Sequence, residues 1–487
     1  MQKILENSLV YKILAAIYSW CGTQWRKSRV VGRFLTQGTG RAASESSVFA
    51  RAWGVLHRFL CAVFETLRLN RLLKGSIFTM PFIWGIIVVF LAPILPTMAV
   101  LGLSLLCFGS LILAFACDRE RKLVYSPMNK FILLYAVVYI VATLTSVTVS
   151  GSLLGGALTT LFILFAVFIQ NSITTRKQFD FLVYAFVISG AAISLYGVYQ
   201  YFFGTFVASG WVDSTMFSGI GVRVYSTLGN PNVLSEYLLL VIPFAGACIL
   251  IVKKFIFKLF FVGCFALMLM CMLLTFARGG WLGLIVAAAI FLVMLDRRFI
   301  IVGIVGLVLL YFMLPDVILD RFFSIGDTTD TSTNFRLFIW LGTIAMLRDF
   351  WFTGIGPGTD AFNMVYPLYS YNTIYSPHSH NLFLQIICDA GISGIVLFLA
   401  ILFGYLRNLC AAISREKDKS SKILQIASIA SVFGFLVQSF TDYSFYNYRV
   451  TLVFWAVLGI GALAARRAQL GYPTARDADA IDAPSSI

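Results

Sequence analysis

Long apolar segments recur along the chain from about Ile77 onward, and each has roughly the length that crosses a lipid bilayer. Short polar or Gly/Pro-containing stretches separate them, as where Pro93 and Pro96 divide the first two segments. The segments lie near residues 77–95, 97–117, 131–148, 152–171, 181–203, 233–252, 255–275, 281–295, 300–314, 382–406, 424–440 and 450–465. This pattern predicts an all-α polytopic membrane protein with about twelve transmembrane helices.

The N-terminal part has a different pattern, in which basic residues are interleaved with apolar ones. Leu9 to Trp20 is too short to span a bilayer, and Val48 to Leu69 alternates arginines with aromatic and aliphatic residues. Both segments are typical of amphipathic helices that lie on an anionic membrane surface. We therefore expect a basic cytoplasmic extension over 1–75, a membrane domain over 76–466 and a polar cytoplasmic tail over 467–487.

The distribution of Lys and Arg predicts the orientation of the chain. If the N-terminus is cytoplasmic, the cytoplasmic parts contain 31 of the 37 Lys and Arg residues. The six on the outer side are Arg223, Arg278, Arg321, Arg336, Arg348 and Arg449. Since Lys and Arg favour cytoplasmic loops, both termini are predicted to be cytoplasmic, and the large loop 315–377, with an amphipathic helix from Asn334 to Leu347, extracytoplasmic.

Composition agrees with a membrane protein. Hydrophobic residues make up 59% of the chain and charged residues only 12%, about half the charged share of a soluble protein. The net charge of +15 follows from the topology and does not indicate a nucleic-acid partner. The nine cysteines include no CxxC pair, so neither a disulfide framework nor a zinc site is predicted.

The candidate chemistry gathers at the predicted outer face. His378 and His380 lie where the large loop meets an apolar segment, and Arg223, Arg278 and Arg336 lie on the same face. Arginine stays charged and holds phosphate oxygens with two parallel hydrogen bonds, which suits the pyrophosphate of a lipid-linked sugar. A histidine can take the proton of an attacking hydroxyl. Together these residues predict glycosyl transfer from a lipid-pyrophosphate sugar, with the arginines stabilising the leaving group.

Each of these residues also has a plainer interpretation. The histidines could only brace the loop, Arg278 could extend to headgroups, Arg336 could pair with a loop aspartate, and Arg223 could brace a turn. Arg321, Arg348 and Arg449 are read as structural. A metal site at His378 and His380 is not predicted, because no third histidine lies on that face and no acidic ligand pattern accompanies the pair.

Three stretches together resemble the O-antigen ligase and polymerase family of bacterial membrane glycosyltransferases. They are Arg223 with Gly229-Asn230-Pro231-Asn232, then Thr275-Phe276-Ala277-Arg278-Gly279-Gly280, and then Arg336 through Gly358 into His378-Ser379-His380-Asn381-Leu382-Phe383-Leu384. The resemblance covers roughly residues 77–465. It implies a helical membrane fold whose large periplasmic loop precedes the tenth or so span.

The resemblance also implies a reaction and a set of residues. The donor would be an undecaprenyl-pyrophosphate glycan, transferred with inversion and without metal or cofactor at the outer face of the bacterial cytoplasmic (inner) membrane. Arg223, Arg278 and His380 match the family's essential residues. Arg336 matches its loop arginine, and we expect His378 and Asn381 to contact substrate, with His378 the less securely matched.

The acceptor stays open, because relatives act on glycans, lipids or proteins. A solute transporter of the bicarbonate type is the alternative function. Transporters place ionisable residues near mid-membrane, and Asp389 and Glu236 are the ionisable residues predicted inside spans here. Asp389 could relay protons or hydrogen-bond a neighbouring helix, and we favour the second interpretation.

Overall fold

The computed structural model describes residues 48–69, 76–124, 126, 128–204, 222–313, 315–324, 331–467 and 470, together with Thr23. The chain divides into two compact units, Met1–Leu69 and Asn70–Ile487, and each is described by itself. In the first unit α5 (Val48–Thr66) is helical, as predicted. The helix predicted at Leu9 to Trp20 and most of the polar tail 467–487 lie outside the described residues.

The second unit is helical and has no strand in its described residues, which confirms the all-α prediction. Its helices are α7 (Met80–Leu91), α8 (Thr97–Ala116), α9 (Asn129–Leu144), α10 (Val149–Ser172), α11 (Arg176–Phe203), α12 (Pro231–Ile251), α13 (Phe255–Leu274), α14 (Arg278–Leu295), α15 (Phe299–Met313), α16 (Asp316–Phe323), α17 (Thr331–Phe350), α18 (Thr359–Val365), α19 (Leu382–Arg415), α20 (Lys419–Ser439) and α21 (Tyr448–Ala464). Short 3₁₀ turns occur at η1 (Ser76–Phe78), η2 (Ser226–Leu228), η3 (Tyr366–Leu368) and η4 (Ser444–Tyr446).

Eight of the described helices are long and apolar enough to cross a membrane, namely α8, α10, α11, α12, α13, α14, α19 and α20. The bent pair α15 and α16 would make a ninth span, and α7, α9 and α21 are shorter apolar helices. Each of the twelve predicted segments coincides with one of these helices. The chain is therefore a multi-pass helical membrane protein, while the count of about twelve spans stays a prediction.

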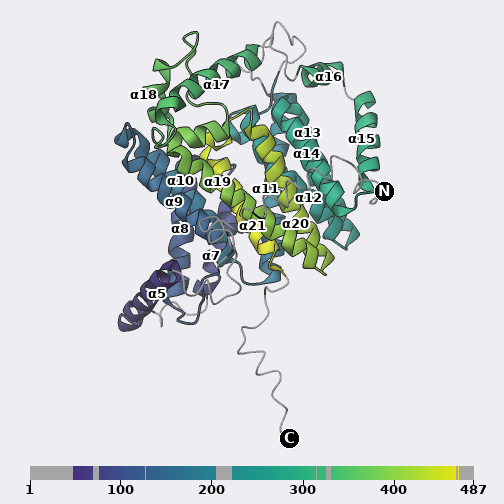
Figure 1. Cartoon of the computed structure of the whole chain (residues 1–487). Coiled ribbons are helices and arrows are strands. Elements are labelled where there is room, and N and C mark those ends of the chain that lie inside the picture. The colour runs from purple at the N-terminus through teal and green to yellow at the C-terminus, as the bar shows by residue number, and fades with distance from the viewer. Residues whose placement is uncertain are drawn as a thin grey trace. The chain divides into compact units, whose positions relative to one another are not determined.

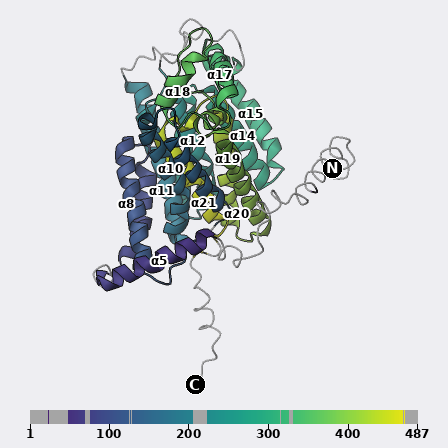
Figure 2. The ribbon, with the colours of Figure 1, turned by 60° about the vertical axis from the view of Figure 1, so that its left-hand side comes forward.

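Helices α10, α12, α20 and α21 form the buried centre of the second unit. α12 packs against α20 and α21, and α21 packs against α10. Large buried side chains fill this centre, among them Trp455, Tyr237 and Phe165. α15 lies at the edge and exposes most of its apolar side chains, whereas α16, α17 and α18 lie across one end of the long helices (Figures 1 and 2).

The connections between helices meet at two opposite ends of the second unit. At the end carrying α17, the guanidinium group of Arg449 donates to the carbonyls of Leu95, Thr227 and Leu228 at 3.4, 3.0 and 3.2 Å. It thereby ties together the α7–α8, α11–α12 and α20–α21 connections. Most of the basic residues lie in the connections of the other end, and the outer arginines gather at the α17 end.

An ion-pair network fastens the basic end. Arg467, just after α21, pairs with Asp180 of α11 and with Asp418, the residue that caps α20, at 2.8 Å each. The Arg467 side chain is largely buried, so its charge depends on these two carboxylates. The network therefore holds three helix ends together on the side away from α17.

Helix α17 confirms that the predicted loop helix exists, but it is longer than predicted and is apolar on two sides. It extends from Thr331 to Phe350, beyond the predicted Asn334 to Leu347. Its buried face includes Ile339 and Met346, yet Leu337, Leu341 and Ile344 form a second apolar stripe that is exposed. Sequence periodicity had indicated one apolar face, whereas the helix is apolar on both sides and is suited to a membrane interface.

Helix α19 is interrupted at Gly391, whose φ of 62° and ψ of −161° are open essentially to glycine. The segment after α17 satisfies the backbone groups that the interruption frees. The Cys388 carbonyl accepts from the Ile355 amide at 2.6 Å, and the Ile392 amide donates to the Trp351 carbonyl at 2.8 Å. Inside a membrane such a break is tolerated only where neighbouring backbone supplies the missing partners. The half of α19 before the break is thus fixed against the loop.

We expect Gly391→Ala to destabilise the protein. A Cβ at this position would collide with the Phe352 carbonyl oxygen, and the backbone conformation alone would cost roughly 1–3 kcal/mol. The thermal unfolding midpoint of purified protein should therefore fall by several degrees. Gly404→Ala on the same helix is the control, because its new Cβ would lie 3.8 Å from the nearest atom, the Met128 Cβ. Equal midpoints for the two variants would show that α19 does not need its break.

The two-ended charge distribution generates a labelling prediction. In a variant lacking the nine native cysteines, Thr331→Cys should react with an impermeant thiol reagent in whole cells, and Lys417→Cys should react only after lysis. Both positions are exposed in the structure, so access should depend on the side of the membrane alone. The reverse labelling pattern would place the histidine loop in the cytoplasm and would rule out the predicted orientation.

Candidate functional site

The histidine loop is fixed at the start of α19. The Asn381 side chain accepts from the Leu384 amide at 3.0 Å, capping the helix, and donates to the Phe440 carbonyl at 2.8 Å. The Trp340 indole donates to the His380 carbonyl at 3.2 Å. These contacts hold His380 at a φ of 49°, a left-handed conformation that non-glycine residues seldom adopt. Asn381 was predicted to contact substrate, and here its amide positions the loop.

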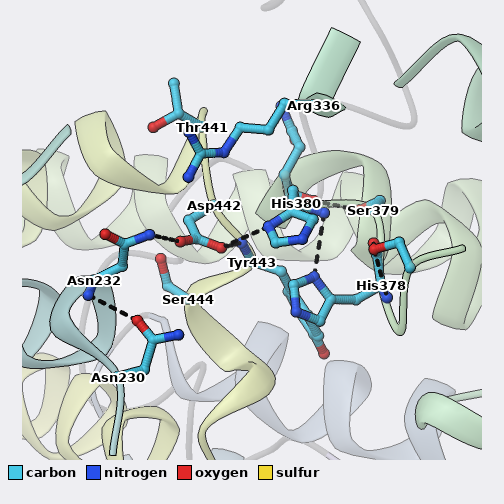
Figure 3. A network of polar contacts seen from close by, with 12 residues as sticks. Asn230, Asn232, Arg336, His378, Ser379, His380, Thr441, Asp442, Tyr443 and Ser444 are labelled. Atoms are coloured by element: carbon cyan, nitrogen blue, oxygen red, sulfur yellow. Dashed lines mark hydrogen bonds and ion pairs between the residues drawn. The ribbon is translucent and has the colours of Figure 1, made fainter. Parts of the chain in front are cut away.

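His380 forms a pair with Asp442, which lies in the connection between α20 and α21. The His380 Nδ1 atom is 3.2 Å from the Asp442 Oδ1 atom, as Figure 3 shows. When Nδ1 donates to this carboxylate, Nε2 is left as the acceptor nitrogen of a neutral ring. Asp442 also accepts from the Asn232 amide at 2.8 Å and from the Tyr443 backbone amide at 2.9 Å. The carboxylate is therefore oriented on three sides.

The His378 side chain packs against His380 and holds its backbone. Its side chain is buried, and its ring lies 4.2 Å from the His380 ring and 4.6 Å from the Tyr446 ring. The His378 Nδ1 atom accepts from the His380 backbone amide at 3.3 Å. Burial, and then the neighbouring His380, lower the pKa of His378 to about 3. Burial therefore favours its neutral form, and its contacts brace the loop; the substrate contact expected from the sequence stays a prediction.

The predicted arginines converge on one cavity, which we call the arginine pocket. Among the described residues its lining is Arg223, Asn232, Phe276, Arg278, Gly279, Arg321, Ser332, Arg336, Gln438, Thr441 and Asp442. Four guanidinium groups therefore face a single carboxylate. Asn232 and Gly279 lie in the first turns of α12 and α14, so the positive ends of two helix dipoles also point toward this cavity.

Uncharged groups hold two of these arginines in place. Arg223 donates through Nε to the Thr275 carbonyl at 2.8 Å and through an η nitrogen to the Asn232 side chain at 2.9 Å. Arg278 donates to the carbonyl and the hydroxyl of Ser324 at 2.9 and 3.0 Å. Carbonyl and hydroxyl partners of this kind orient a guanidinium group without cancelling its charge.

The other two arginines come from the large outer loop. Arg336 on α17 donates to Ser332 at 3.1 Å, and its buried Nε has no hydrogen-bond partner among the described residues. Arg321 on α16 is only 4% exposed although it carries a full charge. A buried charge is costly unless another group compensates it. Arg336, which has an unpartnered buried Nε among the described residues, is therefore suited to an anion bound in the cavity.

Mutual repulsion in the arginine pocket is visible in the pKa of Arg223. Burial lowers that pKa, and the charges of Arg321, Arg336 and Arg278 lower it further, against the opposing effect of Asp442. Burial also acts to raise the pKa of Asp442, but its hydrogen bond to His380 and the charges around it hold the pKa below its usual range. A bound anion would relieve the repulsion that Asp442 alone does not remove.

Asn232 connects the arginine pocket to the histidine pair. Its side-chain oxygen accepts from Arg223 at 2.9 Å, and its amide nitrogen donates to Asp442 at 2.8 Å. Its backbone carbonyl accepts from Gln438 at 3.0 Å, which fixes α12 against α20. The contacts from Arg223 through Asn232 and Asp442 to His380 therefore form one continuous polar chain.

Sequence reasoning missed two of the residues in this arrangement. Asp442 was not considered, although it lies in an outer connection and would have been a carboxylate on the same face as His380. Arg321 was read as structural, yet it lines the arginine pocket beside Arg223, Arg278 and Arg336. Arg348 and Arg449 are not among the lining residues that the structure describes.

The structure changes the argument about a metal. Ligand atoms of His378, His380 and Asp442 lie within 4.8 Å of one another, so the acidic partner that the sequence pattern lacked is present. However, the His378 Nδ1 atom already accepts a backbone amide, and four guanidinium groups near Asp442 oppose a cation. The absence of a metal stays a prediction.

Asp389, on α19, connects the histidine loop to the α20–α21 connection. Its carboxylate accepts from the Gln385 amide at 2.9 Å and from the Tyr443 hydroxyl at 3.4 Å. Gln385 in turn accepts from the Ser379 backbone amide at 2.8 Å. We expected Asp389 to hydrogen-bond a neighbouring helix; these partners lie instead on α19 itself and in the α20–α21 connection, so Asp389 ties the histidine loop to the residue that follows Asp442.

Comparison with known proteins places this geometry in a family. Residues 263–399 match the family model described as O-antigen ligase, a segment that contains Arg278, Arg321, Arg336, His378 and His380. Arg223 and Asp442 lie outside the matched segment and are brought to the site by the fold. Comparison with curated proteins gives no match. The resemblance expected from the sequence is thus confirmed over residues 263–399, where the chain matches the O-antigen ligase family model.

Proposed function

We propose that the protein is a membrane glycosyltransferase that transfers or polymerises a glycan from an undecaprenyl-pyrophosphate donor onto an acceptor hydroxyl. The reaction would take place at the outer face of the cytoplasmic membrane, during assembly of a cell-surface polysaccharide. The observation that carries this proposal is the polar chain that joins the arginine pocket to the His380–Asp442 pair at one end of the helical bundle.

The arginine pocket supplies the donor side of the reaction. A lipid pyrophosphate presents its negative charge at headgroup depth, where the ends of α12 and α14 lie in a membrane-spanning bundle. Planar guanidinium groups bind phosphate oxygens with two parallel hydrogen bonds each. Their charge also stabilises the additional negative charge that develops on the leaving pyrophosphate as the glycosidic bond breaks. Arg223, Arg278, Arg321 and Arg336 would share this role.

His380 supplies the acceptor side. The oxygen of the acceptor hydroxyl forms a bond to the anomeric carbon, the bond from that carbon to the pyrophosphate oxygen breaks, and His380 Nε2 takes the hydroxyl proton. The lipid pyrophosphate leaves with the bonding electron pair. Attack from the face opposite the leaving group inverts the anomeric configuration in one step. The acceptor is a glycan, a lipid or a protein hydroxyl.

Asp442 positions the base and does not touch the substrate in this scheme. Its hydrogen bond to Nδ1 selects the tautomer in which Nε2 is free to accept a proton. Its negative charge also stabilises the imidazolium that forms when the proton arrives, as carboxylates do in other histidine pairs. No metal and no cofactor takes part in this mechanism.

The proposal includes the membrane topology of the protein and the bounds of its three regions. The charge bias favours cytoplasmic termini, a basic interfacial extension over 1–75, a membrane domain over 76–466 with the active face outside, and a cytoplasmic tail over 467–487. The transporter alternative gains no support from the family match. The ionised groups of the site gather at one end of the bundle, and the buried Asp389 is bonded to neighbouring side chains.

Substitution of the arginines by lysine tests the bidentate interaction. Arg278→Lys and Arg223→Lys should each lower glycan transfer by roughly 10²-fold, nearly as far as the alanine variants, because one ammonium group cannot replace the fork. Transfer would be measured with purified protein, lipid-linked glycan and acceptor. Arg348→Lys is the matched control, since Arg348 is exposed on α17 and should tolerate the change. Full transfer by Arg278→Lys would exclude a guanidinium clamp.

Substitution of His380 tests the general base. His380→Ala should fold, insert and bind the lipid donor, yet transfer glycan about 10²–10⁴-fold more slowly, the usual contribution of a general base. His378→Ala should be milder, because His378 braces the loop from a buried position. Undiminished transfer by His380→Ala would remove the base role.

The same assay separates the base from a metal ligand. Wild-type transfer should continue in the presence of a chelator. Activity that is lost to chelator and restored by a divalent ion would instead make His378, His380 and Asp442 a metal site, since their ligand atoms lie close enough to share an ion.

A further inference from the structure

Four aromatic side chains gather where α15 meets α16, and we call them the aromatic elbow: Tyr311, Phe312, Phe322 and Phe323. The Tyr311 ring lies 5.3 Å from that of Phe312 and 6.4 Å from that of Phe323, and the Phe322 and Phe323 rings are 5.8 Å apart. The two helices are bent by 120° at this point. The side chains of Phe312 and Phe323 are 77% and 67% exposed, so the elbow presents a continuous apolar surface.

The aromatic elbow begins where the arginine pocket ends. Arg321, which lines the pocket, directly precedes Phe322 and Phe323 on α16. The next residue, Ser324, accepts two hydrogen bonds from Arg278, another lining residue. A short helix therefore carries a buried guanidinium group and an exposed aromatic surface side by side, and Arg278 fixes its end.

A charged cavity next to an exposed apolar surface matches an amphiphile whose anionic head is joined directly to a hydrocarbon chain. Aromatic rings bury a large area per side chain and have few rotatable bonds, so they contact a flexible chain at a low entropic cost. Sugar and acceptor must approach the pyrophosphate from the His380 side, because Asp442 lines the pocket there. The lipid chain would therefore extend from the arginine pocket toward the aromatic elbow.

We propose that the aromatic elbow binds the polyprenyl chain of the lipid donor, next to the pyrophosphate held in the arginine pocket. This inference rests on the proposed function, because it assumes that a lipid pyrophosphate occupies the pocket. The competing explanation is a general one: aromatic residues are common at membrane interfaces, where they anchor helices without binding a particular lipid. Between Phe299 and the elbow, the exposed large side chains that the structure describes on α15 are aliphatic, for example Ile301, Ile304 and Leu309.

The test compares two ligands on the full-length protein in lipid nanodiscs, without acceptor. Undecaprenyl pyrophosphate has both the anionic head and the chain, whereas inorganic pyrophosphate has only the anion. Phe323→Ser and Tyr311→Ser should each raise the Kd for the lipid about tenfold and leave the Kd for inorganic pyrophosphate unchanged, because the exposed aromatic surface that the bound lipid chain would cover is lost. Ile301→Ser, an equally exposed position on α15, is the control and should alter neither Kd.

Each other outcome overturns the inference in a distinguishable way. If the aromatic variants bind both ligands as the wild type does, the elbow is an ordinary membrane anchor. If they lose both ligands equally, the elbow only shapes the arginine pocket. If inorganic pyrophosphate binds the wild type but the lipid binds no more tightly, the protein has no binding site for the polyprenyl chain. The proposed function is not contradicted by that result. If neither ligand binds the wild type, the arginine pocket and the proposed function fail together.

Discussion

Repulsion among four guanidinium groups is the constraint around which the end of the bundle that carries α17 is organised. Arg223, Arg278, Arg321 and Arg336 come from four different elements, and Asp442 is the one carboxylate among the described lining residues. Carbonyls, hydroxyls and an amide hold Arg223 and Arg278, and these partners fix direction without neutralising charge. Packing of α12, α14, α16 and α17 must therefore supply the free energy that keeps like charges together.

The Asp442 carboxylate acts on both the His380 ring and the arginine pocket. One oxygen faces the ring of His380, and the other faces Asn232, which in turn binds Arg223. The carboxylate lowers the repulsion in the pocket and also sets the tautomer of the histidine. Since both effects depend on the same ionised group, the arginine pocket and the His380 ring are electrostatically coupled. Removal of a negative charge at this point would therefore affect both of them.

The sequence carried the information for part of this arrangement. Apolar segments and the Lys/Arg bias were sufficient to place Arg223, Arg278, Arg336 and the histidines on one face, because spans are long and topology depends on charge counts. Asp442 could not be found in this way, since a single carboxylate in a short connection has no periodicity and reaches His380 across 62 positions of sequence. The place of Arg321 in the pocket was not predicted for a related reason. Its burial depends on the bend between α15 and α16, which no local sequence pattern indicates. The second apolar stripe of α17 was missed because the sequence pattern was interpreted as an amphipathic helix with one apolar face.

The broken helix α19 explains how these groups keep their geometry. The segment from Trp351 to Ile355 bonds the backbone on both sides of the break, and α17, which precedes that segment, contributes Arg336 to the pocket. The same helix holds the His380 carbonyl through Trp340. A displacement of α17 would therefore move Arg336 of the arginine pocket and the backbone of His380 in the same step. Because Asp389 ties the other side of the histidine loop to Tyr443, the loop is held between α17 and the α20–α21 connection. Rigid support of this kind keeps a base and an anion pocket in register, which a loop of polar residues could not do by itself.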